Sequence, residues 1–388
     1  MTVKIDTIAV ASVRDPREMR CFSGIPAHIC LAFEDAGVQI VPSRPLPVKE
    51  LPFYRRFRSA YCRFGLKWAF VEVEPYVLRH QASIVQSIVR GSRTQAVVSI
   101  LLEPIAAKHL GMRTALVHDA TFKLLVDYYD MYTGWSKRSI RLGHKANRKA
   151  LEHASVLIYL SQWAAQSAVR DYGTDRKKVH VIEFGANLRN PPSWEEVADM
   201  VEQRLSTGEH RFLFLGANWT RKGRVDAIAL VRKLREAGVS AFLDVVGCTP
   251  QGRTDAQEFC VEYGFLDKGK SEDQEKLKSL LERASFLLFP SLADCTPCAY
   301  REANAYGLPS IGRDTGGVSQ VIRPGINGFL VSENGDNLDA LTDQIRRYLL
   351  DPNEYRKLSQ TSRNEYEQRL NWTRFVDKTL RLLEGAEA

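Results

Sequence analysis

The chain has 388 residues, of which 44% are hydrophobic and 26% charged, with seven cysteines and a formal net charge of +8. This length predicts two domains, the composition excludes a largely disordered chain, and the odd, scattered cysteines indicate reduced thiols rather than a disulfide framework. The N-terminal sequence lacks the pattern of a secretory signal and no run approaches 18 apolar residues, so a cytoplasmic location is expected.

The positive charge is concentrated in the first half of the chain. Residues 1–190 contain 28 basic and 16 acidic side chains, a balance of +12, whereas residues 191–388 contain 26 and 30, a balance of −4. A basic half of this kind suits nucleic acid, anionic lipid or a phosphorylated substrate.

Both halves alternate short apolar runs with helical periodicity, which is typical of parallel strands buried between helices. The runs of the first half are Thr7–Val13, Val38–Pro42, Ala96–Leu101, Thr114–His118, Val156–Leu160 and Val179–Glu183. Those of the second half are Phe212–Leu215, Phe242–Val246, Phe259–Phe265, Phe286–Phe289, Pro309–Ile311 and Gly328–Val331. The sequence therefore predicts two doubly wound α/β domains that face one another across a cleft and bind ligands at the carboxyl ends of their strands.

Paired prolines mark the boundary between the two halves. The segment "NLRNPPSWEE" has the composition of an interdomain linker, so we expect an N-terminal domain over residues 1–190 and a C-terminal domain over residues 191–371. The last helix, within residues 372–388, is expected to pack back on the N-terminal domain.

An anion-binding turn is predicted between the strand and helix of "FLFLGANWTRKGRVDAIALVRKLREAG". Gly216 follows the strand, and the helix is expected to carry Arg221, Lys222 and Gly223 near its start. The N-terminus of a helix presents unpaired N–H groups, and two cations there favour a phosphate or diphosphate. The alternative interpretation is a solvated basic first turn.

Two acids follow the strand "ASFLLFP". Asp294 is predicted in the loop at its carboxyl end and Glu302 in the next helix, which ends before Gly307 and Pro309. Both carboxylates are expected to face one crevice. For Glu302, in a tightly packed helix, an unpaired buried carboxylate would be costly, and a polyol ligand would satisfy it. As a purely structural alternative, Asp294 caps the helix and Glu302 forms a salt bridge.

The other polar signals lie in loops that follow predicted strands. Gly316 and Gly317 would let backbone amides approach a ligand, although they also suit a simple turn. Gly24 opens a helix in "SGIP", and His118 ends a strand, where a substrate contact and an ordinary loop histidine are equally consistent with the pattern. No GxGxxG motif is present, which disfavours a nicotinamide cofactor.

Cys295 and Cys298 form a CxxC motif without a second pair at suitable spacing. Since zinc sites need four ligands and redox pairs usually open the first helix of a thioredoxin-like unit, we expect no metal and no redox role.

Taken together, these segments resemble glycosyltransferase family 4 (glycosyl transferases group 1), retaining enzymes with the two-domain GT-B fold. The resemblance spans nearly the whole chain and is densest from 212 to 331. The family has a motif in which an acid is followed by seven residues and then by a Glu. Asp294 and Glu302 match this motif, with Asp in place of the usual first Glu. Its diphosphate-binding loop is similar to "GANWTRKG", in which Lys222 keeps the lysine position and Ala217 occupies the arginine position.

Further segments complete the resemblance. "SGIP" is similar to the family's first glycine loop, "VHDATF" to the strand end whose histidine approaches the donor sugar, and "VIEFGAN" to the segment that enters the linker. Gln320 replaces the Glu that many members have after the double glycine, and Arg221 would supply the cation missing at Ala217.

The resemblance implies metal-independent transfer of a sugar, by expectation a hexose, from a nucleotide diphosphate donor with retention at the anomeric carbon. It implies a glycan, lipid-linked or small-molecule acceptor, as in the synthesis of cell-envelope polysaccharide, and no cofactor. Catalytic roles fall on His118, Asp294, Arg221 and Lys222. Donor-binding roles fall on Gly24, Gly216, Arg221, Lys222, Thr296, Pro297, Cys298, Glu302, Gly316 and Gly317.

Residues 51–70 combine an aromatic helical face with surrounding arginines. This pattern fits a peripheral helix that lies on an anionic membrane and brings the enzyme to a lipid-linked acceptor. It equally fits a helix that packs its aromatic face on the domain core.

Two other function classes remain open from the sequence. A nucleotide-sugar-binding protein that kept the fold and lost catalysis is suggested by Ala217, Asp294 and Gln320. Nucleic-acid binding is suggested by the basic charge, but the chain has no recognition motif and its surplus is confined to one half, so we expect no nucleic-acid partner.

Overall fold

The computed structural model describes residues 4–43, 70–247, 258–267 and 269–385. Contacts divide the chain into two compact units, unit 1 (1–183 and 372–388) and unit 2 (184–371). The change at Phe184 precedes the linker predicted from the sequence, and the chain re-enters unit 1 at Trp372. Unit 2 is therefore one continuous stretch inserted into unit 1.

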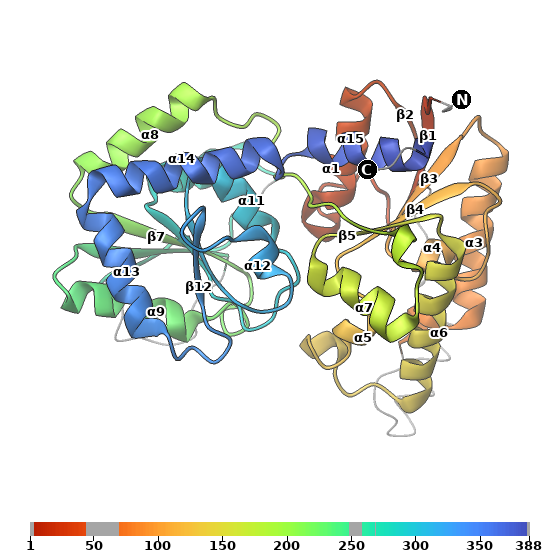
Figure 1. Ribbon diagram of the computed structural model, residues 1–388, viewed down its shortest axis with the longest axis horizontal. Coiled ribbons are helices and arrows are strands. Elements are labelled where there is room, and N and C mark those ends of the chain that lie inside the picture. The colour runs from red at the N-terminus through yellow and green to blue at the C-terminus, as the bar shows by residue number, and fades with distance from the viewer. Residues whose placement is uncertain (1–3, 44–69, 248–257, 268, 386–388) are drawn as a thin grey trace. The chain divides into compact units, whose positions relative to one another are not determined.

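Unit 1 is built on a parallel sheet with the strand order β2-β1-β3-β4-β5-β6 (Figure 1). Its strands are β1 (Thr7–Ala11), β2 (Gln39–Pro42), β3 (Ala96–Ile100), β4 (Arg113–His118), β5 (Val156–Tyr159) and β6 (Val179–Val181). Every residue of β3 and of β5 is buried, as expected for central strands covered on both faces.

Helices connect and cover these strands. They are α1 (Ile25–Asp35), α3 (Pro75–Arg90), α4 (Glu103–Ala106), α5 (Phe122–Leu125), α6 (Lys137–His153), α7 (Gln162–Tyr172) and the C-terminal α15 (Trp372–Glu384). Short 3₁₀ turns cover Cys21–Gly24, Val71–Val73, Asp130–Tyr132 and Arg176–Lys178. Helix α15 packs on α1 and β4 through side chains that include the buried Phe375 and Val376.

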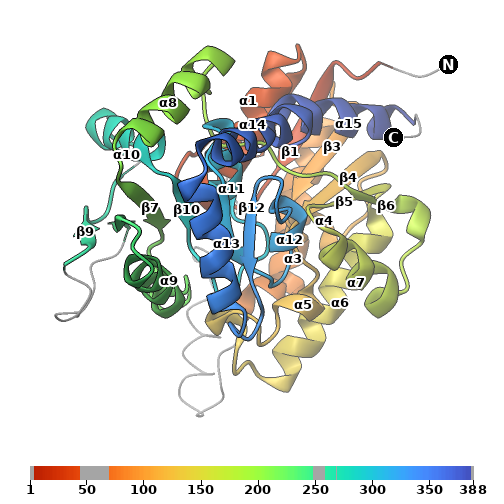
Figure 2. The ribbon, with the colours of Figure 1, turned by 60° about the vertical axis from the view of Figure 1, so that its left-hand side comes forward.

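Unit 2 has a second parallel sheet with the order β12-β11-β10-β7-β8-β9 (Figure 2). Its strands are β7 (His210–Leu215), β8 (Ala241–Val246), β9 (Cys260–Glu262), β10 (Phe286–Leu288), β11 (Ser310–Arg313) and β12 (Gly328–Val331). Its helices are α8 (Trp194–Ser206), α9 (Arg224–Glu236), α10 (Ser271–Arg283), α11 (Cys298–Ala305), α12 (Val318–Val321), α13 (Leu338–Leu350) and α14 (Pro352–Gln368). Helix α9 packs with α13, whereas α14 packs with α8 and α11.

The predicted fold class is confirmed in both units, because each expected apolar run overlaps a strand of a parallel sheet. Ligands of such sheets bind where the strand order reverses, since the loops on either side of that point diverge. In unit 1 this switch point lies between β1 and β3, and in unit 2 between β7 and β10. The loops that follow these four strands are therefore the first places to look for a site.

Candidate functional site

The switch point of unit 2 brings together the two loops that the sequence singled out. One is the loop between β7 and α9, and the other is the loop between β10 and α11. Backbone contacts join them, since the Leu292 N–H donates to the Arg221 carbonyl oxygen at 2.8 Å. The two loops thus form one continuous surface at the carboxyl edge of the sheet.

Gly223 permits the close approach of these loops. Its φ of +82° is a left-handed conformation that favours glycine, and a Cβ atom there would lie 2.0 Å from the Pro290 carbonyl oxygen. The same residue is the N-cap of α9, so the turn before the helix is fixed against the end of β10. Any larger residue would force the two loops apart.

Lys222 and Arg221 both contact Asp294 across the junction. The Lys222 Nζ lies 2.5 Å from Asp294 Oδ2, and Arg221 Nη1 lies 3.3 Å from the same oxygen. Arg221 Nη1 also donates to the Ala293 carbonyl oxygen at 2.7 Å. Asp294 is only 9% exposed, so two cations share one buried carboxylate. In the sequence, Lys222 and Arg221 precede Asp294 by 72 and 73 residues.

The Lys222 side chain is held by an aromatic ring and fits beside a glycine. Its ammonium group lies 4.8 Å from the centre of the Phe289 ring, a cation–π geometry. That ring stacks on Tyr300 with 4.3 Å between the ring centres, and the Tyr300 hydroxyl donates to the Phe289 carbonyl oxygen at 2.9 Å. Burial, with a smaller effect of the Asp294 charge, raises the pKa of Tyr300. A Cβ atom on Gly216 would come within 2.7 Å of Lys222 Cγ, so this glycine leaves room for the lysine stem.

The remaining predicted donor residues of this region lie around the start of α11. Pro297 is the N-cap of the helix and Cys298 is its first residue. Thr296 precedes them, and its buried Oγ1 has no hydrogen-bond partner among the residues that the structure describes. Glu302 lies further along α11 and is 2% exposed. The described cysteines, including Cys295 and Cys298, form no disulfide.

The double glycine lies beside the same loop. Gly316 has a φ of +55°, and the Gly317 N–H donates to the Cys295 carbonyl oxygen at 2.8 Å. The amide of Gly317 therefore fastens the loop between β11 and α12 to the loop that carries Asp294. The sequence reasoning expected both amides to approach a ligand, but the structure uses this one internally.

The two predicted residues of the first half lie in unit 1. Gly24 is the N-cap of α1 with a φ of +81°, and His118 is the last residue of β4. His118 is 7% exposed, and its Nδ1 accepts a hydrogen bond from the Ala120 N–H at 3.1 Å. The unit 2 cluster is thus formed by Arg221, Lys222 and Asp294. Gly24 and His118 belong to unit 1.

Arg313 supports the site and was missed by the sequence reasoning. This last residue of β11 is 4% exposed and contacts Asp226 in the first turn of α9. It also donates to the carbonyl oxygens of Ser332 and Glu333 at 2.9 and 2.7 Å, and to that of Pro290 at 3.4 Å. An arginine within "SIGR" gives no signal of its own, because its importance comes from four segments that only the fold brings together.

The cluster has the electrostatic properties of an anion site. It contains two cations and one carboxylate, and it adjoins the N-terminus of α9, where no side chain caps the helix. Among the described residues, no group of three or more His, Cys, Asp and Glu side chains is arranged to hold a metal ion. Over the same part of the chain, no helix combines the length and the apolar character needed to cross a membrane. The candidate membrane segment, residues 51–70, lies outside the described residues except for its last residue, Phe70.

Comparisons with known proteins agree with this geometry. Residues 197–365 match the family model of glycosyl transferases group 1. A D-inositol 3-phosphate glycosyltransferase of Nocardia farcinica is 29% identical over 218 residues, which cover 52% of this chain and 48% of that protein. The chain therefore aligns with about half the length of that relative.

Solved structures share the whole architecture. Sucrose-phosphate synthase from Thermosynechococcus elongatus has a TM-score of 0.66 and 16% identity, with 97% of this chain and 98% of that chain covered. The Anabaena protein HepE, solved with UDP and glucose, has a TM-score of 0.59 and 13% identity, with 97% and 99% covered. The match to glycosyl transferases group 1 is thus confined to residues 197–365, less than half of the chain, and the solved structures show that the chain has the GT-B fold.

Proposed function

We propose that the protein is a retaining glycosyltransferase that moves a sugar from a nucleotide diphosphate donor to a glycan, a lipid-linked or a small-molecule acceptor. The observation that carries the proposal is the convergence of Arg221, Lys222 and Asp294 at the switch point of unit 2. The HepE structure, which contains UDP and glucose in the same fold, supports a nucleotide sugar as the ligand class.

The two cations suit a leaving group whose charge grows during the reaction. When the bond between the anomeric carbon and the diphosphate oxygen breaks, its electron pair stays on the diphosphate. Arg221 and Lys222, held in place by Ala293 and Phe289, would meet that charge without rearranging, which lowers the barrier electrostatically. The proposed reaction involves neither a nucleophilic side chain nor a metal ion.

Retention requires that the new bond form on the face that the diphosphate leaves. We propose that the acceptor hydroxyl attacks the anomeric carbon on that face and passes its proton to the departing phosphate oxygen. Asp294 would hold hydroxyl groups of the sugar, Glu302 those of the donor ribose, and Gly24, Gly216, Thr296, Pro297, Cys298, Gly316 and Gly317 would line the donor site. His118 of unit 1 would orient the sugar or the acceptor.

A nucleotide screen tests this proposal. Thermal shifts should be measured with UDP, GDP and ADP and with UDP-glucose, GDP-mannose and ADP-glucose, because a ligand of the folded state raises the melting temperature. We expect one base to be preferred. Lys222→Ala should weaken binding of that nucleotide about 10-fold to 100-fold, since a charge-assisted hydrogen bond is worth about 1.5–3 kcal/mol.

The matched control is Lys233→Ala, which removes the same charge from the last turn of α9. Lys233 pairs with the exposed Asp339 at 2.6 Å, away from the loops of the site, so its loss should leave nucleotide affinity unchanged. Equal effects of the two substitutions would refute the assignment of Lys222. Binding without turnover against a broad acceptor panel would favour the catalytically inactive binding protein, and a product with inverted anomeric configuration would rule out retention.

A further inference from the structure

The ammonium group of Lys222 has an aromatic partner as well as an acidic one. Its Nζ lies 2.5 Å from Asp294 Oδ2 and 4.8 Å from the centre of the Phe289 ring. Phe289 directly follows β10 and is fully buried, whereas Lys222 lies in the turn before α9. An incoming diphosphate would compete with the carboxylate for this cation, but it would not compete with the neutral ring.

Tyr300 extends this arrangement beyond the Phe289 ring. The two rings are parallel to within 2°, with 4.3 Å between their centres. Tyr300 is the third residue of α11 and is fully buried, and its hydroxyl donates to the Phe289 carbonyl oxygen at 2.9 Å. One side chain of α11 therefore holds both the ring and the backbone of Phe289.

The backbone of Phe289 is also fixed by β11. Its N–H donates to the Ile311 carbonyl oxygen at 3.2 Å, and its own carbonyl oxygen accepts a second hydrogen bond, from the Ser291 N–H at 2.8 Å. Gly312, the next residue of β11, leaves room for the tyrosine, because a Cβ atom there would come within 2.8 Å of Tyr300 Oη. The end of β10, the start of α11 and β11 thus determine together where the Phe289 ring lies.

A lysine is a flexible side chain, so an ordered cation has to be held by its surroundings. Ordering the stem costs conformational entropy at the moment of binding unless the stem is already ordered in the free protein. The Lys222 side chain is only 14% exposed, and it lies beside Gly216, where a Cβ atom would come within 2.7 Å of Lys222 Cγ. A cation that is ordered in advance suits a leaving group whose negative charge grows.

We propose that Tyr300 is a positioning residue of the glycosyl transfer site and acts on the donor diphosphate through Phe289 and Lys222. The Tyr300 ring sets the tilt of the Phe289 ring, and the Phe289 ring keeps the ammonium group in place when the diphosphate displaces Asp294 from it. Because Tyr300 is fully buried, it acts without touching the substrate. The inference rests on the proposed function, which assigns Lys222 to the diphosphate.

A double-mutant cycle on the full chain separates this role from a general contribution to folding. Calorimetry measures the binding of UDP, GDP and ADP to the wild type, Tyr300→Leu, Lys222→Ala and the double variant. Tyr300→Leu should weaken binding of the preferred nucleotide about 3-fold to 10-fold, the size of a partly buried cation–π contact. The same substitution should have no effect in the Lys222→Ala background, because Tyr300 acts through that lysine. Equal losses in both backgrounds would overturn the inference.

The matched control is Tyr355→Leu. Tyr355 is another buried tyrosine of unit 2, whose hydroxyl donates to the Ser285 carbonyl oxygen at 2.8 Å and whose ring packs edge-on against Phe286, the first residue of β10. Both substitutions remove a buried ring and a hydrogen bond to a carbonyl oxygen, so both should lower the melting temperature. Only Tyr300→Leu should weaken nucleotide binding, and an equal loss of affinity in Tyr355→Leu would reduce the role of Tyr300 to stability.

The conservative variant Tyr300→Phe keeps the ring stack and removes only the hydrogen bond to the Phe289 carbonyl oxygen. It should lower the melting temperature and keep most of the nucleotide affinity, which tests the stack even if Tyr300→Leu does not fold. A loss of affinity in Tyr300→Phe as large as that in Lys222→Ala would contradict a role of the ring.

Acetylation of lysines gives a readout that needs no nucleotide. After treatment with acetic anhydride, peptide mass spectrometry measures the rate of modification at Lys222 relative to Lys233 of α9, which pairs with Asp339. Tyr300→Leu should raise this relative rate about 3-fold to 10-fold, the same factor as in binding, and Tyr355→Leu and Tyr300→Phe should leave it unchanged.

The two readouts keep the inference distinct from the proposed function. If UDP, GDP and ADP all fail to bind the wild-type chain, the proposed function is refuted, and the acetylation rate still decides whether Tyr300 positions Lys222. An unchanged rate at Lys222 in Tyr300→Leu would overturn the inference, even where nucleotide binding by the wild type supports the proposed function.

Discussion

Asp294 is the residue on which the charge balance of the unit 2 site depends. Its Oδ2 is the common partner of Arg221 and Lys222, and both pairs lie in a partly buried setting. In the structure the carboxylate therefore occupies the position of a counter-anion to the two cations. A diphosphate that binds there has to compete with it for the same donors.

Replacing Asp294 with asparagine should separate binding from transfer. With the competing charge removed, the affinity for the preferred nucleoside diphosphate should rise about threefold to tenfold, because a partly exposed ion pair is worth roughly 1 kcal/mol. The transfer rate should fall, since the proposed contact with the sugar hydroxyls is lost. Calorimetry measures the affinity, and a turnover assay on the same preparation measures the transfer rate. Weaker nucleotide binding would show that Asp294 supports the cations and does not compete for them.

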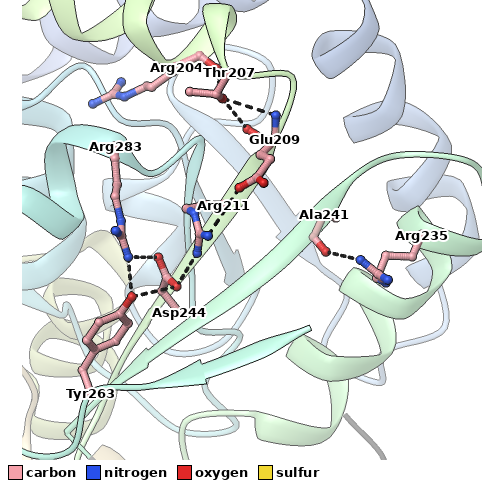
Figure 3. Close-up of polar contacts among 9 residues, drawn as sticks. All are labelled: Arg204, Thr207, Glu209, Arg211, Arg235, Ala241, Asp244, Tyr263 and Arg283. Atoms are coloured by element: carbon pink, nitrogen blue, oxygen red, sulfur yellow. Dashed lines mark hydrogen bonds and ion pairs between the residues drawn. The ribbon is translucent and has the colours of Figure 1, made fainter. Parts of the chain in front are cut away.

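At the scale of elements, β8 carries a buried charge on the β7-β8-β9 side of the unit 2 sheet. Asp244 is 1% exposed and accepts hydrogen bonds from Arg211 of β7 at 2.8 Å and from Arg283 at the end of α10 at 2.9 Å (Figure 3). The Tyr263 hydroxyl, just beyond β9, lies 3.4 Å from the same carboxylate. Asp244 of β8 thus joins β7, the end of α10 and the residue that follows β9.

Asp244→Asn should destabilise this edge of unit 2 by about 2–4 kcal/mol. Breaking a buried ion pair costs about 3–5 kcal/mol, and partial exposure of both arginines reduces that figure. Hydrogen exchange of the β7, β8 and β9 amides, followed by mass spectrometry, should show the loss of protection. Glu209→Gln removes the exposed partner of Arg211 at 3.4 Å and should change stability by less than about 1 kcal/mol; similar effects of the two variants would contradict this account.

At the scale of the whole molecule, unit 1 is completed only by the last helix of the chain. Helix α15 buries Phe375, Val376, Leu382 and Leu383, all at most 5% exposed, within unit 1. Burial of each such side chain contributes about 1.5–3 kcal/mol, so the four together approach the 5–15 kcal/mol stability of a typical domain.

Deleting residues 372–388 should therefore unfold unit 1 and spare unit 2. Limited proteolysis of the truncated chain is expected to degrade residues 1–183 and to leave a resistant fragment near 184–371. That fragment should still bind the preferred nucleoside diphosphate if its site lies wholly in unit 2. A truncated chain with wild-type resistance in its first half would show that α15 is dispensable.

The sequence predicted much of the sheet and part of the site, for physical reasons that differ. Strands such as Ala96–Ile100 and Phe286–Leu288 are buried on both faces and therefore form uninterrupted apolar runs that are readable locally. Lys222 and Asp294 stand out because charged residues follow such runs. Arg313 and the Phe289–Tyr300 stack carry no local signal, since their roles arise from segments that meet only in three dimensions.

The insertion of unit 2 within unit 1 also sets the order in which the protein can mature on the ribosome. Synthesis proceeds from the N-terminus, so residues 1–183 emerge early but lack α15 until residues 372–384 have been made. Unit 2, whose residues are contiguous, is complete before that moment. The nascent residues 1–183 therefore keep an uncovered apolar surface on α1 and β4 while unit 2 folds. We expect chaperone protection to matter most during this interval.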